Sequence, residues 1–185
     1  MPSASLLLWQ NDRMPRLQQI DFHCAASLAA ATLNAHLIDE SLRGYVVLLS
    51  AHFQGLCRDL YTEAAQVIVT KVRPSLQKLI QDQFTAHRKL DRGNPTKDNL
   101  KMDFKRFGFT LELRVDPANV PRLDDLSALN KWRNVAAHQG TTLPIGVPLD
   151  LPSLRSWRTS CDGLAASLDA ILYNQLRRIP RRAPW

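Results

Sequence analysis

Residues 41–72, SLRGYVVLLSAHFQGLCRDLYTEAAQVIVTKV, carry apolar side chains at a spacing that predicts one long amphipathic helix. Steps of three and four residues place side chains on one face of a helix, whereas a half-buried strand would alternate. Ser41 is the predicted N-cap, and Pro74 interrupts the pattern because proline lacks the N–H that an inner helical turn requires. The side chains expected on the buried face are Leu42, Tyr45, Leu49, Phe53, Leu56 and Leu60.

The same spacing extends in both directions from this stretch. It predicts further helices over residues 17–38, 74–90, 96–107, 122–138 and 153–179. In the helix over 74–90 the inward side chains are expected to be Leu76, Leu79, Ile80 and Phe84. Helices of this number and length indicate an all-α bundle, and 185 residues suffice for one domain spanning 1–185.

Residues 109–115 break the helical pattern. Phe109, Leu111, Leu113 and Val115 alternate with polar residues, which is the repeat of a half-buried strand. A lone strand cannot satisfy its own backbone groups. The segment is therefore expected to be an extended loop, half of a short hairpin, or an edge that pairs across a dimer.

The charge of the chain favours an anionic partner. The 24 Lys and Arg residues exceed the 17 Asp and Glu residues, giving a net charge of +7, and the excess lies in residues 71–106 and 150–185. Nucleic acid is the commonest partner of such a basic protein. The alternative is that these residues only form the solvent-exposed faces of helices and bind no partner. The RNA-binding candidates in the first stretch are Arg88, Lys89, Lys101 and Lys105.

Several classes of protein and site are disfavoured. No apolar run approaches the roughly 20 residues that cross a bilayer, and the N-terminus lacks the pattern of a secretion signal, so a cytoplasmic location is expected. Cys24, Cys57 and Cys161 are interpreted as reduced core thiols. The chain has no Gly-rich phosphate loop, no Gly-x-Ser-x-Gly and no Cys-x-x-Cys, and we expect no metal and no cofactor.

The helix predicted over 122–138 carries the residues best suited to chemistry. Arg133, Asn134 and His138 fall in its last two turns, and Asn134 and His138 share a face because they are four residues apart. Lys131, a further RNA-binding candidate, continues this polar stripe with Ser127 and Asp124. An arginine stabilises charge on phosphate oxygens, and a histidine moves a proton to or from a hydroxyl.

The segment Arg133-Asn134-x-x-x-His138, with Gly140 close behind, resembles the motif of the HEPN superfamily. The likeness covers about residues 15–178, which would form the core and leave a basic tail over 177–185. It implies an all-α bundle, usually dimeric, in which the Arg and His of both subunits line one cleft. Some toxins of the superfamily carry a tyrosine two residues after the His, where this chain has Gly140, so control through modification of that tyrosine is not expected.

The resemblance implies a metal-independent endoribonuclease of toxin or anti-phage defence type, which leaves a 2′,3′-cyclic phosphate. Arg133 would stabilise charge, His138 would act as acid or base, and Asn134 would orient His138 or bind the phosphate. The partners implied are RNA, a second copy of the chain, and an antitoxin or defence component. The alternatives are a non-catalytic HEPN-type module that binds nucleotide, RNA or a partner, and a helical scaffold protein.

Overall fold

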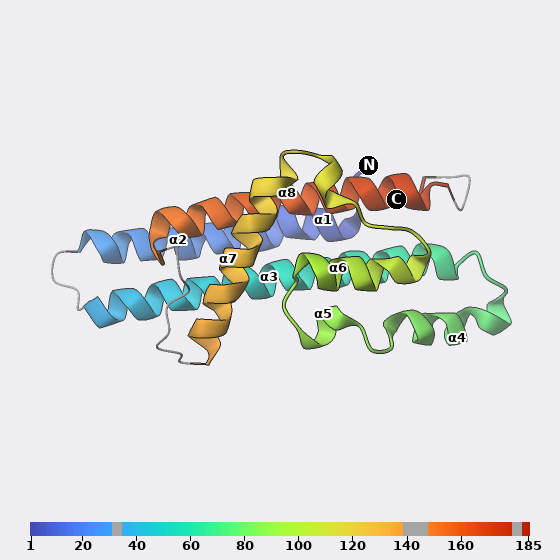
Figure 1. The fold of residues 1–185 in the computed structure, drawn as a ribbon, viewed down its shortest axis with the longest axis horizontal. Coiled ribbons are helices and arrows are strands. Elements are labelled where there is room, and N and C mark those ends of the chain that lie inside the picture. The colour runs from blue at the N-terminus through green and yellow to red at the C-terminus, as the bar shows by residue number, and fades with distance from the viewer. Residues whose placement is uncertain (31–34, 139–147, 179–182) are drawn as a thin grey trace.

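The structure is a computed structural model that describes residues 1–30, 35–138, 148–178 and 183–185. These residues form helices joined by short turns, and they contain no strand, so the all-α prediction is confirmed for them. Three long helices lie side by side along the long axis, and a fourth crosses them (Figure 1). None of the described helices is both long and apolar enough to cross a membrane.

The elements follow one another as α1 to α8, with shorter turns between them. Their bounds are α1 Ala4–Leu8, a π-helical turn Trp9–Arg13, α2 Met14–Ala29, α3 Ala35–Val69, α4 Pro74–Thr85, α5 Lys89–Arg92, α6 Lys97–Phe104, 3₁₀ turns Lys105–Phe107 and Leu113–Val115, α7 Asn119–Ala137 and α8 Leu151–Leu176. The three long helices that lie side by side are α2, α3 and α8, and α7 packs across α3 and α8 (Figure 1).

The helix α3 is the centre of the core. All six side chains predicted on its inner face, from Leu42 to Leu60, are buried. Its start was predicted wrongly, because the helix already includes Ala35 and Ser41 lies within it. The Ser41 hydroxyl donates to the Leu37 carbonyl at 2.7 Å. A serine hydroxyl satisfied by the carbonyl four residues earlier fits inside a helix and does not act as a cap.

The N-terminal residues that precede α2 belong to the packed core. Trp9 is fully buried and contacts Phe53 edge to face, with ring centroids 6.0 Å apart. Its indole Nε1 donates to Asp162 Oδ1 on α8 at 2.9 Å. A buried tryptophan needs such a partner for its N–H. The apolar run Leu6–Trp9 is too short to show a helical period, so the sequence predicts no helix here.

The helix α4 differs from its prediction in length and in burial. It ends at Thr85, before the expected residue 90, and His87 adopts a positive φ of 56°. Leu76 and Leu79, predicted to point inward, are 44% and 57% exposed. Both predictions fail because α4 diverges from the bundle and has no buried residue. The helix α4 lies at the edge of the molecule (Figure 1).

The segment over 109–115 forms no strand. Leu111 and Leu113 are buried and Thr110 and Glu112 exposed, as the alternation predicts, but Val115, expected on the buried side, is 80% exposed. Residues Leu113–Val115 form a 3₁₀ turn. The buried Asn119 side chain donates from Nδ2 to the Leu113 carbonyl at 3.0 Å. A side chain therefore satisfies a backbone group that a neighbouring strand would otherwise pair.

The three cysteines are buried and none forms a disulfide, as the sequence analysis predicted. Two other predictions fall on parts of the chain that the structure does not describe. Gly140, expected to stop the helix of the motif, lies outside the described residues, as do Arg181 and Arg182 of the basic tail.

Candidate functional site

The helix α7 carries the Arg-Asn-x-x-x-His segment at its C-terminal end. Leu123, Leu126, Leu129 and Trp132 are buried on its inner side. This apolar stripe fixes the rotation of the helix, because turning it would expose large side chains to water. The opposite, polar stripe therefore has a fixed direction. Asn134 and His138 lie at its C-terminal end, whereas Arg133 points about 140° away from His138 around the helix.

Asn134 forms hydrogen bonds with both other residues of the motif. The Arg133 guanidinium donates from Nη1 to Asn134 Oδ1 at 3.3 Å, and the His138 backbone N–H donates to the Asn134 carbonyl at 3.1 Å. Arg133 is half-buried, whereas the His138 side chain is exposed at the end of the helix. The guanidinium has five N–H donors, so most of them stay available for a phosphate.

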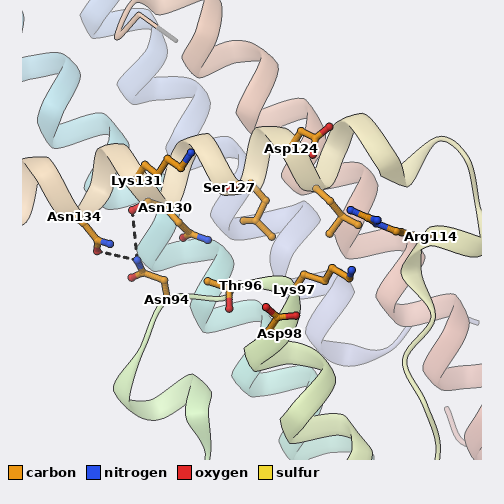
Figure 2. A pocket seen from close by; sticks show the side chains of 12 residues that line it. Asn94, Thr96, Lys97, Asp98, Arg114, Asp124, Ser127, Asn130, Lys131 and Asn134 are labelled. Atoms are coloured by element: carbon orange, nitrogen blue, oxygen red, sulfur yellow. Dashed lines mark hydrogen bonds between the residues drawn. The ribbon is translucent and has the colours of Figure 1, made fainter. Parts of the chain in front are cut away.

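A residue that the sequence analysis did not identify completes this arrangement. Asn94 donates from Nδ2 to Asn134 Oδ1 at 2.9 Å, so this one oxygen accepts from Asn94 and Arg133 (Figure 2). The segment around Asn94 is itself held in place, because Gln54 on α3 donates to the Gly93 carbonyl at 2.9 Å and Asn99 on α6 donates to the Asn94 carbonyl at 2.8 Å. The pattern Arg92-Gly93-Asn94-Pro95 predicts a loop but gives no sign of this long-range contact.

The polar stripe of α7 forms one wall of a pocket with a volume of about 510 Å³ (Figure 2). Asp124, Ser127, Lys131 and Asn134, predicted to share a face, all line it. The facing wall is formed by the loop before α6 and by the first turn of α6. Arg114 lies at one side of the pocket (Figure 2). The residues of this facing wall are Asn94, Thr96, Lys97 and Asp98.

The pocket holds charges of both signs. Lys97, Arg114 and Lys131 bring three cations, and Asp98 and Asp124 bring two carboxylates. None of these five side chains takes part in an ion pair among the described residues. Unpaired Lys and Arg side chains at a concave surface suit the binding of an anionic ligand.

Among the predicted RNA-binding residues, Lys131 alone lines this pocket. Arg88 is engaged elsewhere, since it forms a forked pair with Asp91 and stacks over the Tyr61 ring at 5.4 Å. Lys101 lies 3.6 Å from Glu112, and the Lys89 backbone N–H donates to Asp103 Oδ1 at 2.9 Å. Lys89 and Lys105 have exposed side chains. A contribution of these four residues to RNA binding stays a prediction.

No family model, curated protein or solved structure matches the chain. The site must therefore be interpreted from its own chemistry. Across the described ranges, no three His, Cys, Asp or Glu side chains come together in a way that could hold a metal ion. The groups that the site does offer are a guanidinium, an imidazole, three carboxamides and several unpaired charges.

Proposed function

We propose that the protein is a metal-independent endoribonuclease of toxin or anti-phage defence type, with its site at the end of α7. The observation that carries the proposal is the hydrogen bond from Arg133 to Asn134, which lines a pocket with three unpaired cations, with His138 exposed one turn further along the chain. An arginine and an accessible imidazole near the end of one helix supply the two functions that phosphodiester transfer needs, charge stabilisation and proton movement. Arg133 and His138 point about 140° apart around α7, so in the proposed site the long Arg133 side chain swings into a groove shared with a second subunit.

The proposed reaction is an internal transfer at phosphorus. The 2′-oxygen of the RNA attacks the adjacent phosphate, the bond from phosphorus to the 5′-oxygen breaks, and a 2′,3′-cyclic phosphate and a 5′-hydroxyl result. One imidazole takes the proton from the 2′-hydroxyl, and an acid gives a proton to the leaving 5′-oxygen. Arg133 stabilises the negative charge that gathers on the non-bridging oxygens. Asn134 holds the Arg133 guanidinium through Oδ1.

A dimer would supply the second proton-transfer group. Each protomer contributes a single histidine to the motif, and base and acid stand on opposite sides of the reacting phosphate in such a transfer. In the proposed assembly, His138 of each protomer faces a shared groove. The exposed position of His138 at the end of α7 supports this arrangement, because a buried imidazole could not reach a second subunit. An antitoxin or defence partner would restrain the activity.

The decisive assay incubates the purified protein with RNA in EDTA and compares it with His138→Ala and Arg133→Ala variants. Loss of a general acid or base lowers the rate by about 10²- to 10⁴-fold. His23→Ala is the matched control, because His23 is also exposed but lies on α2. RNA decay that is equal in the wild type and the His138→Ala variant would exclude the proposal.

A second function, RNA binding without cleavage, is favoured by one observation. The Asn134 carboxamide oxygen accepts hydrogen bonds from Arg133 and Asn94, so these contacts are already formed with no substrate bound. A preformed site of this kind serves binding as well as catalysis. Intact RNA together with an affinity that falls steeply with salt would support this alternative.

A further inference from the structure

The pocket beside Asn134 contains a buried polar group that the proposed ribonuclease chemistry does not use. Asn130 lies on α7 one turn before Asn134, and its side chain is directed towards the Thr96 side of the pocket (Figure 2). The residue is only 5% exposed. Neither its Nδ2 nor its Oδ1 has a hydrogen-bond partner among the described residues.

An unpaired buried carboxamide is costly. Each unsatisfied buried donor or acceptor costs about 1–3 kcal/mol, and most such groups in native proteins have a partner. Leucine or methionine would fill the same position on α7 without that cost. Because both atoms of the amide are unpaired and the residue lines one pocket, the partner they lack is best supplied by a ligand in that pocket.

The lacking partner must offer an acceptor and a donor side by side. A carboxamide presents its oxygen and its NH₂ group in one plane, which matches a planar group with a complementary edge. The adenine edge with the N6 amino group and N7 is the match that asparagine makes in nucleic-acid recognition. In single-stranded RNA an unstacked base exposes this edge.

The rest of the pocket suits a nucleotide. Leu123 and Leu126, both nearly buried, provide an apolar surface against which the face of a base can pack. Lys97, Arg114 and Lys131 are available to bind the flanking phosphates, because none of them forms an ion pair among the described residues. A volume of about 510 Å³ lies within the range of about 300–1,000 Å³ that is typical of small-molecule sites.

The amide lies at the pocket wall and is shielded from water. A base therefore reaches it when a neighbouring side chain moves aside. The long, flexible side chains of Lys97 and Lys131 flank the same pocket, and lysine stems change rotamer at little cost. The entry of a base would thus bring the lysine ammonium groups towards the RNA backbone.

We infer that this pocket holds one unstacked adenine of the RNA substrate, that Asn130 reads its N6 and N7 atoms, and that the scissile phosphate lies next to it at Arg133 and His138. The inference rests on the proposed ribonuclease function for the identity of its ligand. It adds a specificity-determining residue, Asn130, that the motif does not contain.

The test measures binding, so that it does not depend on cleavage. Short oligonucleotides UUXUU, with X as A, G, C or U and 2′-fluoro riboses that cannot be cleaved, are titrated against the full chain by fluorescence anisotropy. The wild type is expected to bind the adenine oligonucleotide about 10- to 100-fold more tightly than the others. Equal affinities for all four, or a preference for a base other than adenine, would overturn the inference.

Two variants of the protein then test whether Asn130 recognises the adenine. Asn130→Asp keeps the shape of the side chain but replaces its donor, and it should abolish the adenine preference. Asn174→Asp is the matched control, since Asn174 is an exposed residue of α8, and it should retain the preference. An adenine preference that persists in a folded Asn130→Asp variant contradicts the assignment of Asn130.

A change in the ligand makes the test independent of how well that variant folds. An oligonucleotide with 7-deazaadenine lacks the N7 acceptor and should lose most of the preference for the wild-type protein. Full retention of the preference would overturn the inference. The proposed ribonuclease function can fail separately. Adenine preference without cleavage keeps the pocket and rejects the enzyme, whereas cleavage without base preference does the reverse.

Discussion

Asn94 and Asn134, which lie on opposite sides of one pocket, are joined by a hydrogen bond of 2.9 Å from Nδ2 of Asn94 to Oδ1 of Asn134. This bond connects the loop before α6 to the catalytic segment proposed on α7. It also orients the carboxamide whose oxygen accepts from Arg133. The position of the Arg133 guanidinium thus depends on Asn94, a residue 40 positions before Asn134 in the chain.

The first prediction concerns this contact. Asn94→Ala removes one of the two donors to Asn134, which leaves the carboxamide and Arg133 less well oriented. We expect the single-turnover rate of RNA cleavage to fall about tenfold, because small losses of alignment at a reacting centre are costly. The midpoint of thermal unfolding, measured in parallel, should change little. A cleavage rate equal to that of the wild type would show that the contact does not position the site.

The second prediction concerns the N-terminal helix. Trp9→Ala removes a fully buried ring that packs against Phe53, so it should lower the free energy of unfolding by about 3–5 kcal/mol. Leu8→Ala is the control, because Leu8 is 44% exposed and its loss should cost far less. Urea unfolding followed by circular dichroism measures both. Similar values for the two variants would mean that the N-terminal helix is not packed in the core.

The third prediction concerns alkaline pH. Burial raises the pKa of Tyr61 from its ordinary value of 10.0 to about 12, although Arg106 and Arg88 nearby act in the opposite direction. The hydroxyl also donates to the Phe84 carbonyl at 2.8 Å. Between pH 10 and 12 the unfolded chain loses this proton first, so the free energy of unfolding should fall as the pH rises through that range.

Absorbance at 295 nm, recorded as a difference between the wild type and Tyr61→Phe, should reveal one tyrosine that ionises near pH 12. The stability of the variant should decline less steeply across the same pH range. If the difference spectrum showed that Tyr61 ionises near its ordinary pKa, the buried environment of Tyr61 would be contradicted.

The fourth prediction concerns the cysteines. Burial raises the pKa of the Cys57 and Cys161 thiols, and the thiolate is the reactive form. Cys24 is also buried, and its pKa is raised as well. Ellman's reagent should therefore label none of the three thiols rapidly in the native protein and all of them in guanidinium chloride. A rapidly labelled native thiol would contradict the packing of the helix that carries it.

The sequence predicts those features that depend on local periodicity. The buried face of α3 and the shared polar face of Asp124 and Lys131 on α7 follow from helical spacing alone. The role of Ser41 could not be predicted in this way. A serine either caps a helix or donates to a backbone carbonyl inside it, and the neighbouring turns decide which. The exposure of Leu79 depends on the departure of α4 from the bundle, which is a tertiary property.

The candidate site divides along the same line. The stripe that ends at Asn134 is contained in one helix and is visible in the sequence. Asn94 comes from a distant loop, and the lack of a partner for Asn130 becomes apparent only when the opposite wall is in place. Such contacts depend on how the loop before α6 lies against α7, and a local sequence motif does not show this.

The most direct test of the central claim is the chemistry of the RNA ends. A short RNA is incubated in EDTA with the wild type or with His138→Ala, and the fragments are identified by mass spectrometry. The account predicts 2′,3′-cyclic phosphate and 5′-hydroxyl ends with the wild type and uncut RNA with the variant. Uncut RNA with the wild-type protein, or the same fragments with both proteins, would contradict it.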